Sequence, residues 1–258
     1  MRIDWPLIGV VVGAVLYQRG RRRSEVRREL CFYGGLLVVV FAAEWPVDSY
    51  ADTLFWVHMV QHVLLTMVAP PLILLGRPWP RAARPLPLGA RRALARAAHA
   101  GRAVVAPVPA FVLFNGMLLL WHVPALYGLT LRNQLVHDLE HALFFGTALV
   151  FWTHLAPTSR RPRLSELHRI AYGLGAILVS WVLALVLALA SHPLYAHYAT
   201  LATRPLGLSA LADQQLAAGI MWVPASVPFT IAVLVAAYRL VEAPRARSTA
   251  RDLRPRET

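Results

Sequence analysis

The sequence contains no lysine and only one cysteine, Cys31. A single thiol cannot form an intramolecular disulfide, and it excludes every metal site that needs a pair of cysteines. Charged residues are also scarce, at 15% of the chain, whereas 57% of the residues are hydrophobic. This composition argues against an ordinary soluble domain and is typical of proteins that cross a membrane several times.

Long apolar runs predict an all-α membrane bundle of about seven transmembrane helices. The runs cover residues 3–17, 30–45, 53–75, 104–121, 135–152, 170–190 and 211–240. We expect one transmembrane domain, residues 1–245, followed by a basic cytoplasmic tail, residues 246–258. Because the first run begins at Ile3 with no basic segment before it, we expect no cleavable signal.

The positions of the 26 arginines predict the orientation in the membrane. Alternate connections hold 23 of them, in residues 19–28, 77–102, 160–169 and from 239 onward. The opposite set of connections holds Arg2, Arg132 and Arg204. Since cytoplasmic loops carry the arginine excess, the N-terminus is expected outside and the C-terminus inside. The net charge of +13 is therefore distributed between apolar runs, which argues against nucleic-acid binding.

Two histidine pairs are the main candidates for a functional site. His58 and His62 lie in the third apolar run, and His137 and His141 lie in the fifth. A spacing of four residues places both members of a pair on one helix face. Both runs lead inward from the outside, so the pairs are expected at a similar depth in the outer half of the bilayer. Ionisable groups at that depth need partners, a metal or a wet cavity, and we predict one metal or haem site.

Further polar residues and a thioether are expected on the same side of the membrane. The predicted metal ligands are His58, His62, His122, His137, His141, Asp213 and Met221. The residues predicted to hold or orient these ligands are Gln61, Asp138, Glu140 and Gln214. Imidazoles suit copper, zinc and iron alike. The thioethers of Met59 and Met221 would favour monovalent copper, although methionine also fills gaps in helix bundles.

Four motifs occur in order along the chain. They are HMVQH at 58–62, WHVPALY at 121–127, HDLEHALFF at 137–145 and DQQLAAGIMWVP at 213–224. Together they resemble the multi-spanning CtaG family of cytochrome c oxidase assembly factors. The resemblance implies a non-catalytic protein of the bacterial plasma membrane that binds or delivers copper for a haem–copper oxidase. Its expected partners are oxidase subunits and the lipid bilayer. By motif match it assigns roles to His58, His62, His122, His137, Glu140, His141, Asp213, Gln214 and Met221.

Other readings of the same residues stay open beside copper. The pattern HxxEH at 137–141 also occurs in zinc proteases, where Glu140 would activate a zinc-bound water and Asp213 would be a third ligand. Alternatively, His58 or His62 could face His137 or His141 across haem b. A third possibility is a transporter whose polar residues line an ion path.

Overall fold

The computed structural model describes residues 5–21, 25–44, 46–156 and 163–252, with side chains described as far as residue 242. Every regular element in these ranges is a helix, which confirms the all-α fold. The longer helices are α1 (Trp5–Arg19), α2 (Val26–Ala43), α4 (Phe55–Val63), α5 (Ala69–Leu75), α7 (Leu88–Ala100), α8 (Pro107–Trp121), α10 (Gln134–Leu155), α11 (Glu166–Leu189), α13 (Ala210–Trp222) and α14 (Ser226–Asp252). The shorter ones are α3 (Val47–Ala51), η1 (Leu64–Val68), α6 (Pro78–Ala82), α9 (Pro124–Thr130), α12 (Ala196–Thr200) and η2 (Pro205–Gly207).

Three helical segments are long and apolar enough to cross a membrane: Phe55–Leu75, Glu166–Leu189 and Ala210–Glu242. A fourth candidate is α8 followed by α9, with a bend of 81° between them. α10 has 22 residues, a sufficient length, but its histidines and acidic residues lower its mean hydropathy. Each predicted apolar run therefore contains a helix, whereas the count of seven spans stays a prediction.

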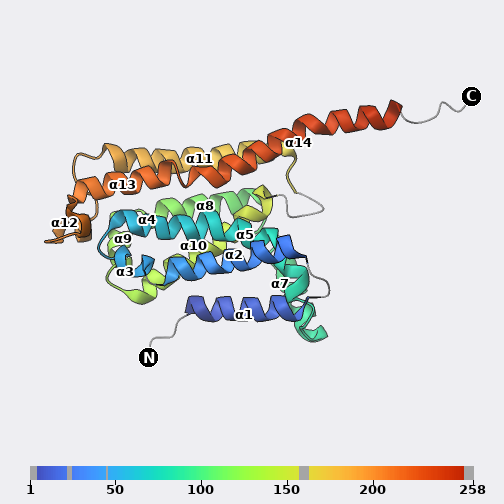
Figure 1. Cartoon of the computed structure of the whole chain (residues 1–258), viewed down its shortest axis with the longest axis horizontal. Coiled ribbons are helices and arrows are strands. Elements are labelled where there is room, and N and C mark those ends of the chain that lie inside the picture. Colours follow the sequence, from blue (N-terminus) through green and yellow to red (C-terminus); the bar gives the residue numbers. More distant parts are fainter. Residues whose placement is uncertain (1–4, 22–24, 45, 157–162, 253–258) are drawn as a thin grey trace, which may run out of the picture.

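The continuous segment α4–η1–α5 is central to the bundle. It packs against α2, α10 and α13, while α11 packs against α13 and α14. Figure 1 shows α11, α13 and α14 together along one edge of the bundle and α1 along the opposite edge. Side chains of α4 are thus surrounded by several helices, and this position explains the burial of its polar residues.

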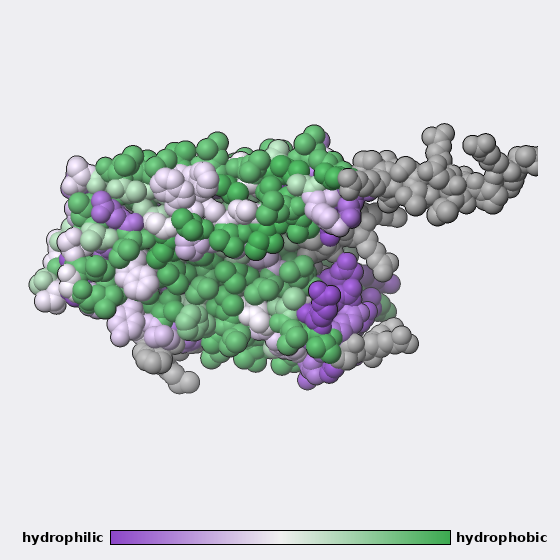
Figure 2. All heavy atoms as spheres, turned by 45° about the horizontal axis from the view of Figure 1, so that its top comes forward, coloured by the Kyte–Doolittle hydropathy of each residue, from purple (hydrophilic) through white to green (hydrophobic). Residues whose placement is uncertain are grey.

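The two ends of the bundle differ in character. The end of α1, the helix α7 and the distal part of α14 lie at one end, and α3, α9 and α12 lie at the other (Figure 1). Hydrophobic side chains cover most of the visible face, and hydrophilic ones gather toward the ends (Figure 2). α7 has no buried residue. The expected boundary at residue 245 falls within α14, and residues 253–258 of the expected tail lie outside the described residues.

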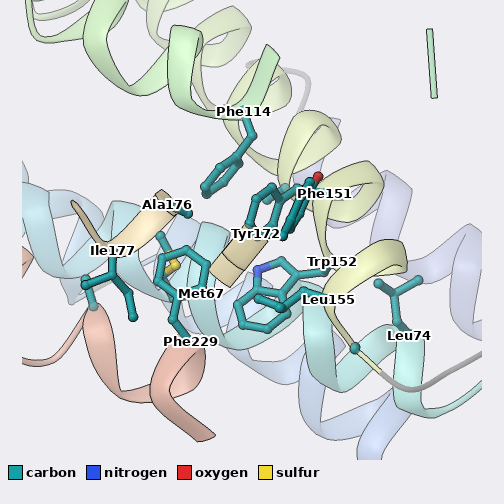
Figure 3. Packing of buried hydrophobic residues seen from close by; sticks show 13 residues of the cluster. Met67, Leu74, Phe114, Phe151, Trp152, Leu155, Tyr172, Ala176, Ile177 and Phe229 are labelled. Atoms are coloured by element: carbon teal, nitrogen blue, oxygen red, sulfur yellow. The ribbon is translucent and has the colours of Figure 1, made fainter. Parts of the chain in front are cut away.

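Aromatic stacking fixes α10 between its neighbours. Phe151 stacks on Phe114 of α8, with ring centroids 4.4 Å apart, and on Tyr172 of α11 at 4.6 Å. Trp152 stacks on Phe229 of α14 at 5.3 Å. Figure 3 shows these rings in one cluster. Such packing fixes the rotation of α10 about its axis and therefore the direction of its histidines.

The π-helical turn η1 directly follows the first histidine pair. Pro70 has no N–H and cannot donate to the carbonyl of Thr66 four residues earlier. The indole Nε1 of Trp152 donates to that carbonyl instead, at 2.9 Å. Ala69 donates five residues back, to Leu64, which makes the turn wider than an α-helical one. Turns of this kind are frequent at functional sites.

Three helix starts in the second half of the sequence are capped by side chains. Asn133 accepts hydrogen bonds from backbone N–H groups at the start of α10, and Ser165 and Ser209 do so for α11 and α13. Such caps satisfy N–H groups that have no partner within the helix. They also fix the residue at which α10 begins, one turn before His137.

Candidate metal centre

The start of α4 is held by a carboxylate from α13. Asp213 is fully buried, and its two oxygens accept hydrogen bonds from the backbone N–H groups of Phe55 and Trp56, each at 2.9 Å. The negative charge also complements the positive end of the helix dipole. The sequence suggested that Asp213 lies among the histidines. The structure instead places it at the N-terminal end of α4, where both of its carboxylate oxygens accept backbone hydrogen bonds. It fixes the first turn of α4 and therefore the position of His58.

The two histidine pairs meet between α4 and α10. Nε2 of His58 lies 2.9 Å from Nε2 of His62. The ring centroids of His58 and His137 are 5.4 Å apart, as are those of His62 and His141. The ring centroids of His137 and His141 are 4.1 Å apart. We call these four side chains the histidine cluster.

Glu140 adds a carboxylate to the histidine cluster. It is fully buried, and its Oε1 lies 3.9 Å from Nε2 of His62. Ligand atoms of His58, His137 and His141 all lie within 4.8 Å of one another, and so do those of His58, His62 and Glu140. His58 belongs to both groups, which makes it the geometric centre of the site.

A buried tyrosine determines which nitrogen of His58 faces the cluster. The hydroxyl of Tyr198 donates to the carbonyl of Ala51 at 2.7 Å, so it can only accept from Nδ1 of His58, 3.2 Å away. Burial raises the pKa of Tyr198 well above its ordinary value, and the hydroxyl keeps its proton. His58 in its neutral form therefore carries its proton on Nδ1 and presents the lone pair of Nε2 to the cluster.

Six buried polar atoms around the cluster have no hydrogen-bond partner among the described residues. They are Nδ1 of His62, Nε2 of His122, Nε2 of His137, Nε2 of His141, and both carboxylate oxygens of Glu140. Leaving one such atom unsatisfied costs about 1–3 kcal/mol. A metal ion bound by His137, His141 and Glu140 would remove much of that cost, so the residues present fit a metal better than they fit a purely structural role.

Two residues predicted to orient the imidazoles have other partners. Nε2 of Gln61 donates to the carbonyl of Ala42 at 2.9 Å and to Asp48 at 3.1 Å, which ties α4 to the end of α2. Asp138 accepts from Gln134 one turn earlier in α10, at 2.9 Å. Both residues therefore support the helices that carry the cluster.

Gln214 of α13 connects the end of α11 to the segment that precedes α12. Its Oε1 accepts from the backbone N–H of Leu194 at 2.7 Å, and its Nε2 donates to the carbonyl of Leu187 at 3.0 Å. Tyr195 donates to the carbonyl of His122 at 3.1 Å. These bonds hold the segment that carries Tyr198 over the cluster. Sequence reasoning missed Tyr198, whose one visible signal is that it follows Tyr195 and His197 in the connection between α11 and α13.

His122 and Met221 lie beside the cluster and not within it. With His62 they border a cavity of about 30 Å³. A porphyrin is far larger than this cavity, and the imidazoles of the cluster pack directly on one another, so the geometry leaves no room for haem between the two pairs. The zinc-protease scheme loses its expected third ligand, because Asp213 is engaged by α4. The arrangement suits a small ion held by imidazoles and one carboxylate.

Proteins of three mycobacteria are similar to most of this chain. Uncharacterized proteins of Mycobacterium bovis and Mycobacterium tuberculosis are each 28% identical over 240 residues, which is 89% of this chain. An uncharacterized protein of Mycobacterium leprae is 25% identical over 237 residues, or 88% of the chain. The chain spans 36% of the length of each of these relatives. No solved structure matches.

The family comparison covers both histidine pairs and the helices that hold them. The model of the cytochrome c oxidase caa3 assembly factors, Caa3_CtaG, matches residues 11–243. That range includes α2 to α13 and all the residues of the site. The chain thus belongs to the CtaG family of cytochrome c oxidase caa3 assembly factors.

Proposed function

We propose that this protein binds copper in the histidine cluster and supplies it to a haem–copper cytochrome c oxidase during assembly. The observation that carries the proposal is the meeting of four histidines and Glu140 in a family of oxidase assembly factors. Four of their buried ligand atoms, Nε2 of His137, Nε2 of His141 and both oxygens of Glu140, have no hydrogen-bond partner among the described residues. A buried cluster that lacks internal partners is costly unless it serves a ligand.

The role proposed for the protein is binding and delivery without catalysis. His58, His137 and His141 would hold the ion through their ring nitrogens, and Glu140 would supply a neutralising carboxylate. His58 is orientated for this by its bond to Tyr198. The expected partners are oxidase subunits within the bilayer of a bacterial plasma membrane, and no nucleic acid is involved.

We further propose seven spans with the N-terminus outside and the C-terminus inside. The support is the alternation of the arginine-rich connections, together with the location of α7 and the distal part of α14 at one end of the bundle (Figure 1). In this orientation the histidine cluster lies in the outer half of the bilayer. A reporter at the C-terminus that is active only in the cytoplasm is the expected result. Activity outside the cell would refute the orientation.

The function is tested by comparing copper content and oxidase activity in two histidine variants. His137→Ala removes a buried member of the cluster, and His192→Ala removes an exposed histidine of an outer loop. We expect His137→Ala to lower bound copper by elemental analysis and to lower oxidase activity in a host that lacks other family members. His192→Ala should match the wild type in both measurements.

Two outcomes would reject the proposal that the histidine cluster binds copper for oxidase assembly. Copper-free wild-type protein, or His137→Ala protein with full copper and full oxidase activity, would show that the cluster does not carry the function. Membrane abundance is measured in parallel, so that a loss of folded protein is distinguished from a loss of metal.

A further inference from the structure

A small cavity lies beside the histidine cluster and is bordered by His62. Its volume is about 30 Å³, and it is bordered by α4, η1, α8, α10, α11 and α13. Three of the five methionines of the chain line it: Met59, Met67 and Met221. All three are at most 5% exposed. The side chains of three buried methionines, each a soft and polarisable thioether, therefore meet at one small cavity.

Two of the residues that line this cavity, His62 and His122, each have a buried imidazole nitrogen without a hydrogen-bond partner among the described residues. Nδ1 of His122 lies 2.7 Å from the carbonyl of Leu118 and must donate to it, so Nε2 keeps its lone pair. Nε2 of His62 faces His58, which leaves Nδ1 on the opposite edge of the ring. Both Nε2 of His122 and Nδ1 of His62 are buried and have no hydrogen-bond partner among the described residues.

The donor set has a definite chemical preference. Thioethers and imidazoles together suit monovalent copper, whereas divalent hard cations need the carboxylates that the residues lining this cavity lack. A cavity of about 30 Å³ has room for one small occupant, since about 10–15 Å³ of such space is enough for a water molecule. The hydroxyl of Ser180 is turned to the carbonyl of Met221, at 3.5 Å, and is not needed as a ligand.

We propose that this cavity is a second copper site, specific for the monovalent ion, formed by His62, His122, Met59, Met67 and Met221. We call it the thioether chamber. The inference rests on the proposed copper function and divides it between two sites that share one side chain. Nε2 of His62 lies against His58, and the same side chain borders the chamber, so one imidazole is shared by the two positions.

The experiment uses the purified full chain loaded with monovalent copper under anaerobic, reducing conditions. X-ray absorption spectroscopy reports copper–sulfur scattering, and elemental analysis reports copper per chain. The test variant combines Met59→Leu, Met67→Leu and Met221→Leu, because leucine keeps the volume and removes the thioether. Met117→Leu is the matched control, since Met117 lies in α8 but does not line the chamber.

We expect copper–sulfur scattering in the wild type and in Met117→Leu, and its loss in the triple variant together with a lower copper content. Should the triple variant fold poorly, Met59→Leu and Met221→Leu singly are each expected to weaken monovalent copper binding on the order of 10–100-fold. In His137→Ala the sulfur-bound ion is expected to remain.

Two results would contradict the proposal that the thioether chamber is a copper site, and they have different consequences for the histidine cluster. Copper with only nitrogen and oxygen neighbours in the wild type, and in equal amount in the triple variant, would refute the chamber and leave the histidine cluster as the single site. Wild-type protein that takes up no copper in either oxidation state would refute both the chamber and the proposed function.

Discussion

Alanine at His58 or at His141 is expected to weaken the binding of divalent copper by at least the roughly 10–100-fold that follows the loss of a residue that only orients a metal ligand, and alanine at both positions is expected to weaken it little further. Ligand atoms of these two residues and of His137 lie within 4.8 Å of one another and can share one ion. Groups that act on the same ion are not additive. The double variant should fall short of the summed effects by about 0.5–3 kcal/mol.

Divalent copper is the suitable probe because it has an electron paramagnetic resonance signal with nitrogen couplings. The thioether chamber prefers the monovalent ion, so this signal reports the histidine cluster. His192→Ala serves as the control, since His192 is exposed. Fully additive losses, or an unchanged signal in the double variant, would show that His58 and His141 do not hold a common ion.

The histidine pairs could be predicted because their arrangement depends on local geometry. A separation of four residues places two side chains on one helix face, whatever the rest of the fold. The alternation of arginine-rich connections then gave both helices the same direction. These two arguments predict a similar depth for the pairs, and the structure brings His58 and His137 side by side, with ring centroids 5.4 Å apart.

Tertiary contacts decided the roles that the sequence could not reveal. Asp213 is separated from Phe55 by 158 residues, and no local pattern connects the two. Tyr198 reaches His58 from a short helix that is held in place by bonds of Gln214 and Tyr195. A carboxylate or hydroxyl in an apolar run looks the same in the sequence whether it binds a metal or a backbone N–H group.

The hydropathy of α10 shows the conflict between spanning a membrane and carrying a site. The helix is long enough to cross, but His137, Asp138, Glu140 and His141 lie within its first eight residues and lower its apolar character. Asn133 caps it, and stacked aromatic rings hold its second half. Polar residues that oppose local stability are expected where function requires them.

The replacement Asp213→Ala is expected to destabilise the protein by about 2–4 kcal/mol, because it removes a buried helix cap and leaves two N–H groups unsatisfied. Its carboxylate accepts from Phe55 and Trp56 and is fully buried. Asp213→Asn keeps one acceptor oxygen and should show an intermediate loss. The measurements are the thermal unfolding temperature of the purified protein and its abundance in membranes, with and without added copper.

A capping role and a ligand role predict different patterns for these variants. If Asp213 holds α4, unfolding temperature and abundance fall together in Asp213→Ala, and added copper does not restore them. Asp138→Ala is the control, because Asp138 accepts from a neighbouring side chain on α10 and should change stability by less than about 0.5 kcal/mol. If Asp213→Ala instead keeps normal stability and loses only its bound copper, Asp213 is a copper ligand. The two N–H groups at the start of α4 would then need another acceptor, because helix ends buried without one are rarely tolerated.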